Sequence, residues 1–166
     1  MRQIKALGLA ALLVMGLCSN GWAAGKGDTF ENDLLKLIFN APAIANIADN
    51  AATSPLTNLF VSMHTADPAD AGVQNTSEAA YTGYARVSVA RTSGGWTVSG
   101  NSVSPVANID FGECTASCGS NLTHWCVGVA SSGATKNLYC GALSTAITMS
   151  VGTIPRLKTT TTITED

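Results

Sequence analysis

The chain has 166 residues, a formal net charge of −2 and only 12% charged side chains. This length favours one domain that is large enough to bury a core of its own. The small and mixed charge argues against nucleic acid and against an anionic membrane surface as partners.

The N-terminus has the pattern of a signal peptide, which we place at residues 1–23. Arg2 and Lys5 supply the positive start, and residues 6–17 form an apolar run that is too short to span a bilayer comfortably. Two alternatives are a lipid-modified Cys18 and an uncleaved helix. The pattern predicts an exported chain, whether periplasmic, cell-surface or extracellular, that touches a membrane only through this leader.

We expect the rest, residues 24–166, to form one domain that begins with a helical arm over residues 28–40. Asp28 can cap this helix, with Glu31 at the capping-box spacing. Helical periodicity predicts one apolar stripe, made of Phe30, Leu34, Leu37 and Ile38. The arm either packs on its own domain or docks on a neighbouring subunit.

The remainder is rich in threonine, serine, glycine and β-branched residues, which suits strands and turns. Short strands separated by turns predict a mainly β fold, an antiparallel β-sandwich or jelly-roll-like domain with a short N-terminal α-helix. In the first strand Leu59, Val61 and Met63 share one face. We expect strands at 59–64, 84–89, 96–99, 103–106, 108–111, 122–129, 137–143, 146–150 and 157–164.

A long polar loop, residues 65–80, follows the first strand, and loops of this length often carry function. We predict a partner-binding surface here, made of Asp67, Asp70, Glu78 and Tyr81. His64 and Asp67 could form a hydrolase triad with Ser62 or Ser77, but their spacing is more typical of a turn, and no nucleophile elbow is present. The acidic residues lack the spacing of a calcium loop. We therefore predict no enzyme, no metal and no cofactor.

Four cysteines follow the leader, and an exported chain favours two disulfides. We predict a local Cys114–Cys118 clip and a cross-strand Cys126–Cys140 bond, although four cysteines allow three pairings. A zinc site completed by a histidine is the alternative, but the spacing matches no common zinc motif.

Trp96, Tyr81 and Tyr84 could form an aromatic platform that binds sugars. Such residues more often pack in a core or on a sheet face. A secreted carbohydrate-binding module is therefore kept as the weakest of three functional hypotheses.

Several blocks of the chain resemble, in the same order, a family of small phage virion proteins commonly labelled tail fibre proteins. These blocks include MHTADP at 63–68, GYAR at 83–86, THWC at 123–126, NLYCGAL at 137–143 and PRLKTTTTITED at 155–166. The likeness covers residues 29–166. It implies a β-sandwich that self-associates or docks on a viral shell or tail, and it brings no catalytic residues with it.

The first hypothesis is therefore a structural, non-enzymatic protein of phage origin, a tail-fibre or capsid-decorating subunit that acts through protein–protein assembly. Its partners would be copies of itself, in a homo-oligomer, or other virion or surface proteins. The second hypothesis is an exported bacterial surface or filament subunit with the same fold. If the leader is not used, we expect the protein on the virion.

Overall fold

A computed structural model describes residues 28–43 and 56–165 of the chain. The predicted leader, residues 1–23, lies outside these ranges and stays a prediction. The side chains of Asp28 and Phe30 also lie outside what the structure describes, and with them the predicted cap and one member of the predicted stripe.

Within the described residues the fold is mainly β, with antiparallel sheets and one short helix, as the sequence predicts. The strands of these residues form three sheets, with the orders β2-β1-β6-β7, β3-β4-β9 and β5-β8. The elements are α1 (Asp28–Phe39), β1 (Asn58–His64), β2 (Val87–Ala90), β3 (Trp96–Ser99), β4 (Ser102–Pro105), β5 (Ile109–Asp110), β6 (Leu122–Gly128), β7 (Asn137–Ile147), β8 (Arg156–Leu157) and β9 (Ile163–Thr164).

Strand β1 lies inside the largest sheet, between β2 and β6. The predicted alternation is confirmed, because Leu59, Val61 and Met63 are at most 1% exposed. Val61 pairs with Val127 of β6, and Met63 pairs with Trp125. These side chains therefore form one apolar face of the sheet.

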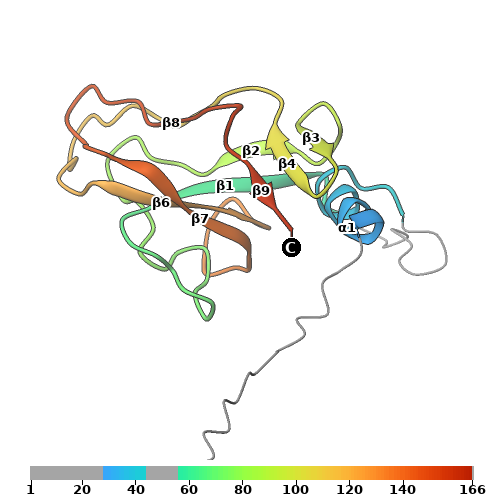
Figure 1. Cartoon of the computed structure of the whole chain (residues 1–166). Coiled ribbons are helices and arrows are strands. Elements are labelled where there is room, and N and C mark those ends of the chain that lie inside the picture. The colour runs from blue at the N-terminus through green and yellow to red at the C-terminus, as the bar shows by residue number, and fades with distance from the viewer. Residues whose placement is uncertain (1–27, 44–55, 166) are drawn as a thin grey trace, which may run out of the picture.

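The core lies between this face and the two smaller sheets, which form a second layer (Figure 1). Val61 and Trp125 from the first layer line a small interior gap together with side chains of the second layer: Trp96, Val103, Pro105, Ile109, Leu157, Thr161 and Ile163. Residues 65–76, the green loop below the sheet in Figure 1, cover the opposite face.

Helix α1 packs against β3 and β4 at one end of the molecule (Figure 1). Leu35 and Phe39 are completely buried, whereas Leu34 and Leu37 are partly exposed. The buried face is thus rotated from the predicted stripe, and Glu31, which was expected off that stripe, is only 4% exposed. The ring of Phe39 fixes the orientation of the helix, since it packs edge-on against the ring of Trp96 with the ring centroids 4.8 Å apart.

The strands expected at 84–89, 137–143, 146–150 and 157–164 have other bounds in the structure. The expected break near residues 144–145 is absent from β7, because pairing with β6 continues to Ile147 through a register shift. The expected strand at 157–164 is instead two short strands, β8 and β9, which pair with different partners. Strand β2 begins only at Val87, because the residues before it serve a polar network instead of a ladder.

Candidate interaction surface

The four residues predicted to form a partner-binding loop are divided between surface and interior. Asp67 and Asp70 are exposed near the tip of segment 65–86. Tyr81 is only 6% exposed, and its hydroxyl donates to the Gly112 carbonyl at 2.9 Å. The acidic tip is therefore the part of this loop that a partner can reach.

Glu78 holds the loop to the domain instead of facing solvent. Its two carboxylate oxygens accept from Arg86 Nε at 2.6 Å and Nη2 at 2.7 Å, and from the Tyr84 hydroxyl at 2.9 Å. Arg86 also donates to the carbonyls of Ala130 and Gly133 in the β6–β7 connection. The hydrogen bonds to Glu78 raise the pKa of Arg86, and burial raises that of Tyr84.

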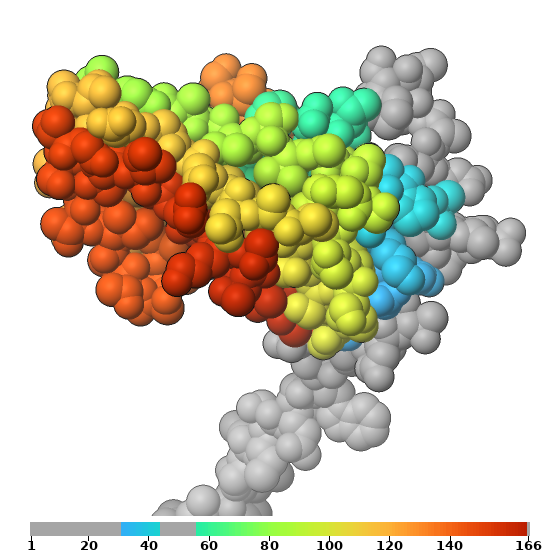
Figure 2. All heavy atoms as spheres, turned by 90° about the horizontal axis from the view of Figure 1, so that it is seen from above, coloured from blue at the N-terminus to red at the C-terminus, as the bar shows by residue number. Residues whose placement is uncertain are grey.

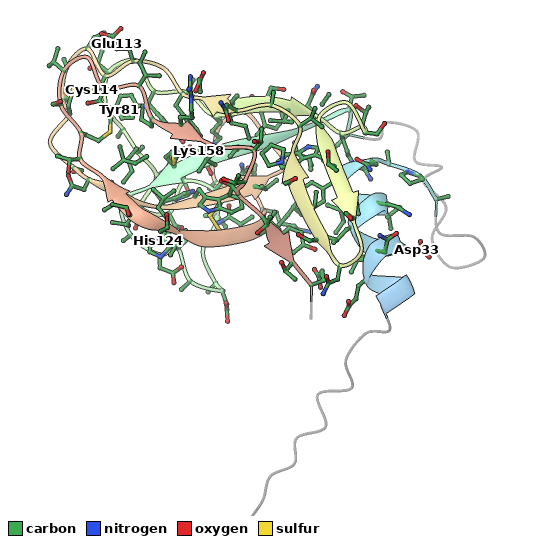
Figure 3. The ribbon with its side chains drawn as sticks, turned by 45° about the horizontal axis from the view of Figure 1, so that its top comes forward. Asp33, Tyr81, Glu113, Cys114, His124 and Lys158 are labelled. Carbon is green, nitrogen blue, oxygen red and sulfur yellow. A yellow bond between two sulfur atoms is a disulfide. The ribbon has the colours of Figure 1, made fainter. Side chains whose placement is uncertain are left out.

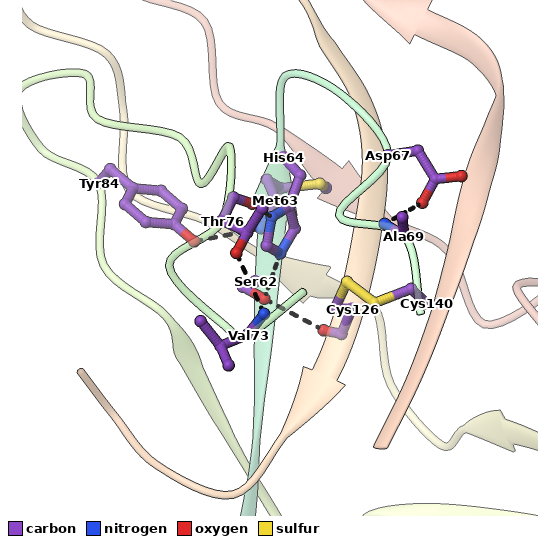
Figure 4. The surroundings of a disulfide bond; sticks show 10 residues. All are labelled: Ser62, Met63, His64, Asp67, Ala69, Val73, Thr76, Tyr84, Cys126 and Cys140. Atoms are coloured by element: carbon purple, nitrogen blue, oxygen red, sulfur yellow. Dashed lines mark hydrogen bonds between the residues drawn. A yellow bond between two sulfur atoms is a disulfide. The ribbon is translucent and has the colours of Figure 1, made fainter. Parts of the chain in front are cut away.

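His64 lies at the end of β1 with no exposed surface. Its Nδ1 is 2.8 Å from the Thr76 carbonyl, so Nδ1 carries the proton and donates. Its Nε2 then accepts from the Ser62 hydroxyl, also at 2.8 Å. Burial is the largest of the effects that lower the His64 pKa below its usual value. Figure 4 shows this chain of hydrogen bonds beside the Cys126–Cys140 pair.

The triad considered from the sequence is not assembled. Asp67 Oδ1 accepts from the Ala69 backbone N–H at 2.9 Å, and the Thr76 carbonyl takes the place beside His64. Ser62 is also completely buried. A substrate therefore cannot reach this serine in the folded chain.

Gln74 is a positioning residue that sequence reasoning missed, because a glutamine in a polar loop gives no signal of burial. Its Oε1 accepts from the backbone N–H groups of Val129 and Ala130 at 3.1 and 3.0 Å. The side chain lies directly on Gly128, where a Cβ would come within 2.1 Å of it. Segment 65–86 therefore fits the sheet only because residue 128 is glycine.

The acidic tip, Asp67 and Asp70, borders a hollow of about 370 Å³ at the start of β7. The tip is shaped by a left-handed Ala69, at φ 57°, and by Gly72, where a Cβ would come within 2.1 Å of the Pro68 carbonyl oxygen. The hollow is lined by Asp67, Ala69, Asp70, Gly72, Asn137, Leu138, Tyr139 and Cys140.

A second hollow, of about 470 Å³, lies on the other side of β7, towards the C-terminal segment. Figure 2 shows the orange β7 and the red C-terminal residues side by side on this face. Trp125, Leu143 and Lys158 are among its lining residues, together with several threonines between 160 and 162. The two hollows border different halves of β7, the first at residues 137–140 and the second at residues 141–147.

The arm that could dock on a neighbour is fastened to its own domain. Arg91 donates from Nε and Nη2 to the carbonyls of Ile38 and Leu37, which belong to the last turn of α1. These carbonyls have no partner within the helix, so the guanidinium serves as a C-terminal cap. Asn32 adds a hydrogen bond to the Gly100 carbonyl at 2.7 Å.

The cysteines lie in the two predicted pairs. Cys114 and Cys118 have Cα atoms 6.0 Å apart, and Cys126 and Cys140 lie directly opposite each other in β6 and β7 with Cα atoms 4.1 Å apart. Cys114 of the first pair lies beside Tyr81 at one end of the molecule, and α1, which carries the labelled Asp33, lies at the other end (Figure 3). Within the described residues, no three histidine, cysteine or acidic side chains gather as metal ligands.

The aromatic rings of the carbohydrate hypothesis do not form a surface platform. Trp96 is 2% exposed, Tyr81 is 6% exposed, and Tyr84 stacks on Phe111 with ring centroids 6.2 Å apart. These rings pack in the interior because they fill the space between the layers and under the loop.

Comparisons with known proteins identify the family of this chain. The curated proteins contain no match to this chain. The family model described as podophage GP4 fiber I protein gp80 matches residues 26–164. None of the described helices is long and apolar enough to cross a membrane. Since the match covers most of the sequence, the chain belongs to this family of phage fibre proteins.

Proposed function

We propose that the protein is a non-enzymatic structural subunit of phage origin, a tail-fibre or capsid-decorating component that acts by contact with other proteins. The observation that carries this proposal is the family match over residues 26–164. The burial of Ser62 and His64 supports it, because the nearest approach to a catalytic pair faces no solvent.

The proposed partners include further copies of the same chain, joined along β7. This strand has 11 residues, NLYCGALSTAI, with neither a charge nor a proline. It lies at the edge of its sheet, and no described strand pairs with its outer side. Proteins that stay monomeric usually protect such an edge with lysine, proline or a covering segment. An unprotected edge of this length favours strand addition by a copy that carries an equally uncharged edge.

The register identifies a residue whose backbone N–H points away from β6. The short Cα distance between Cys126 and Cys140 marks a pair without mutual ladder hydrogen bonds. Ala142 lies two residues after Cys140 and opposite His124, so it also belongs to a pair without mutual ladder hydrogen bonds. Its N–H therefore faces the open edge and is free to bond a second copy.

The test compares Ala142→Pro with Ala142→Ser, by light scattering after gel filtration and by negative-stain microscopy of the chain from residue 24. We expect oligomers for the wild type and for Ala142→Ser. We expect monomers for Ala142→Pro, because proline removes the outward donor and spares the β6 ladder. Discrete wild-type monomers at high concentration would argue against self-assembly as the function, whereas oligomers of Ala142→Pro would argue only against this edge.

The acidic tip, Asp67 and Asp70, is the surface that we propose for a different partner on the virion, with Glu78 and Tyr81 as its internal supports. Double substitution to Asn is expected to weaken attachment to that partner and to leave the melting temperature unchanged. Retained attachment would direct attention to the arm, where Phe30, Leu34, Leu37 and Ile38 remain the proposed inter-subunit residues.

An exported bacterial surface or filament subunit is the second candidate, and it is favoured by the signal-peptide pattern of residues 1–23. In that case the chain reaches the periplasm, the cell surface or the medium. Mass spectrometry of the protein from a bacterial culture tests this, since export predicts a chain that begins after residue 23. An intact Met1 would contradict the processed leader.

A further inference from the structure

Residues 65–76 form a flap on the face of the large sheet that is opposite the core. The flap lies along the start of β7, where Gln74 N–H donates to the Thr135 carbonyl at 2.7 Å, and then returns over His64. It ends beside β1, where Thr65 N–H donates to the Ser77 carbonyl. Figure 4 shows the flap passing over His64 and the Cys126–Cys140 pair.

The underside of the flap meets one titratable group that is completely enclosed. Both ring nitrogens of His64 are occupied, one by the flap at Thr76 and one by Ser62 of β1. Because Nδ1 donates to a carbonyl and Nε2 accepts a hydroxyl proton, this arrangement requires the neutral ring.

The charged groups around His64 would give a protonated imidazole ring little net stabilisation. Glu78 forms an isolated β-bridge with His64, but its carboxylate is already bound bidentately by Arg86. From the other side His64 faces His124, its register partner in β6. Tyr84, the remaining titratable neighbour, donates its hydroxyl proton to Glu78. Burial is the main cause that lowers the His64 pKa, with smaller effects of Arg86 and His124, and the flap carbonyl and Glu78 oppose them only in part.

Protonation would place a second N–H on Nε2, aimed at the Ser62 hydroxyl. Ser62 could accept it only by turning its own proton elsewhere, and its other neighbour, the Cys126 carbonyl, is 3.5 Å away. At that distance the hydrogen bond is weak. The imidazolium ring gains full hydration only when the flap lifts from the sheet.

We propose that His64 is an acid-sensitive lock, which holds the flap and its acidic tip on the sheet while the ring is neutral and releases them when the ring is protonated. The opened flap would present Asp67 and Asp70 in a different place, so acid would change the surface offered to a partner. The lock belongs to the single chain, and its test is independent of whether the chain assembles.

The direction in which pH changes flap opening follows from the linkage between opening and proton binding. The open state has an ordinary histidine pKa of about 6.5, and the closed state has a lower one. Opening therefore binds a proton, and closure is fully favoured above about pH 6.5. The opening equilibrium constant should rise by up to about tenfold for each pH unit below that value, until the closed-state pKa is reached.

Hydrogen exchange by mass spectrometry of the full chain measures this opening in peptides that cover residues 65–78, with intrinsic rates corrected for pH. The variants are His64→Gln, whose amide can donate to Thr76 and accept from Ser62, and His124→Gln, which changes the other of the two histidines. We expect a rise in exchange between pH 7.5 and 5 in the wild type and in His124→Gln, and none in His64→Gln.

An equal rise in His64→Gln, or no rise in the wild type, would overturn the proposal. If His64→Gln fails to fold, an NMR titration of the wild-type imidazole C–H signals decides the matter. The lock requires the His64 pKa to lie below 6.5, so a value at or above 6.5 would refute it.

Discussion

Segment 65–86 and helix α1 are both attached to the β-sheets, but by different physics. The segment is held by specific hydrogen bonds, chiefly those that Arg86 and Gln74 make with the β6–β7 connection. The helix is held by apolar burial of Leu35 and Phe39. A buried polar group that loses its partner costs its full desolvation free energy, whereas the stability lost with an apolar contact grows with the volume removed. The loop should therefore be the less tolerant region, although it has no regular structure.

The strongest test of this comparison is Arg86→Ala. The substitution leaves the Glu78 carboxylate, whose side chain is 15% exposed, without its cation, and it orphans two carbonyls. We expect the free energy of unfolding to fall by about 3–5 kcal/mol, measured by urea denaturation. Arg156→Ala, which breaks the exposed pair with Asp110, is the matched control and should leave the urea midpoint unchanged. Equal effects of the two substitutions would contradict the comparison.

On the helix side, Phe39→Ala should reduce the free energy of unfolding by about 3 kcal/mol, because it removes a completely buried ring from its contact with Trp96. Thermal denaturation gives the stability, and the near-ultraviolet circular dichroism of Trp96 reports the lost contact. Phe39→Leu should recover much of the loss, since it refills part of the volume. Hydrogen exchange in residues 65–78 should stay unchanged, and an increase there would show that the two regions are coupled.

The two cysteine pairs should contribute differently to the free energy of unfolding. Replacement of Cys126 and Cys140 by serine opens a loop with a sequence separation of 14 residues, and the chain-entropy model then predicts a loss of about 3 kcal/mol. For Cys114 and Cys118, with a separation of 4, the model gives about 2 kcal/mol. Urea denaturation of the two double variants measures this order. Thiol titration of the denatured wild type should find none of these four cysteines free, and four free thiols would refute both bonds.

Arg91→Ala should have the smallest effect, about 1–2 kcal/mol, because water can replace the guanidinium at the end of α1. Burial lowers the pKa of Arg91 without neutralising it at ordinary pH. Proteolysis between α1 and β1 should become faster in Arg91→Ala, while Arg91→Lys should lie between the variant and the wild type. An unchanged cleavage rate would show that the apolar contacts hold the helix without this cap.

Much of the fold could be predicted because it depends on local pattern. The alternation in β1 and the helical start at Asp28 both follow from spacing that each segment carries within itself. The cysteine pairs agree with the prediction, although four cysteines allow three pairings. The candidate site was harder to predict, since Glu78 and Tyr81 look like loop surface in the sequence, whereas Glu78 is partly enclosed and Tyr81 buried through partners that lie 8 and 31 residues away.

The sequence by itself determined a mainly β domain with one helix, the place of its long loop and its likeness to phage fibre proteins. Only the tertiary structure decided which face of α1 is buried, that β7 continues through Ser144 and Thr145, and that His64 is enclosed between Thr76 and Ser62. The physical reason is that these outcomes depend on pairing with distant strands, and the free energy of such pairing outweighs the local preference for a turn or for an exposed polar side chain.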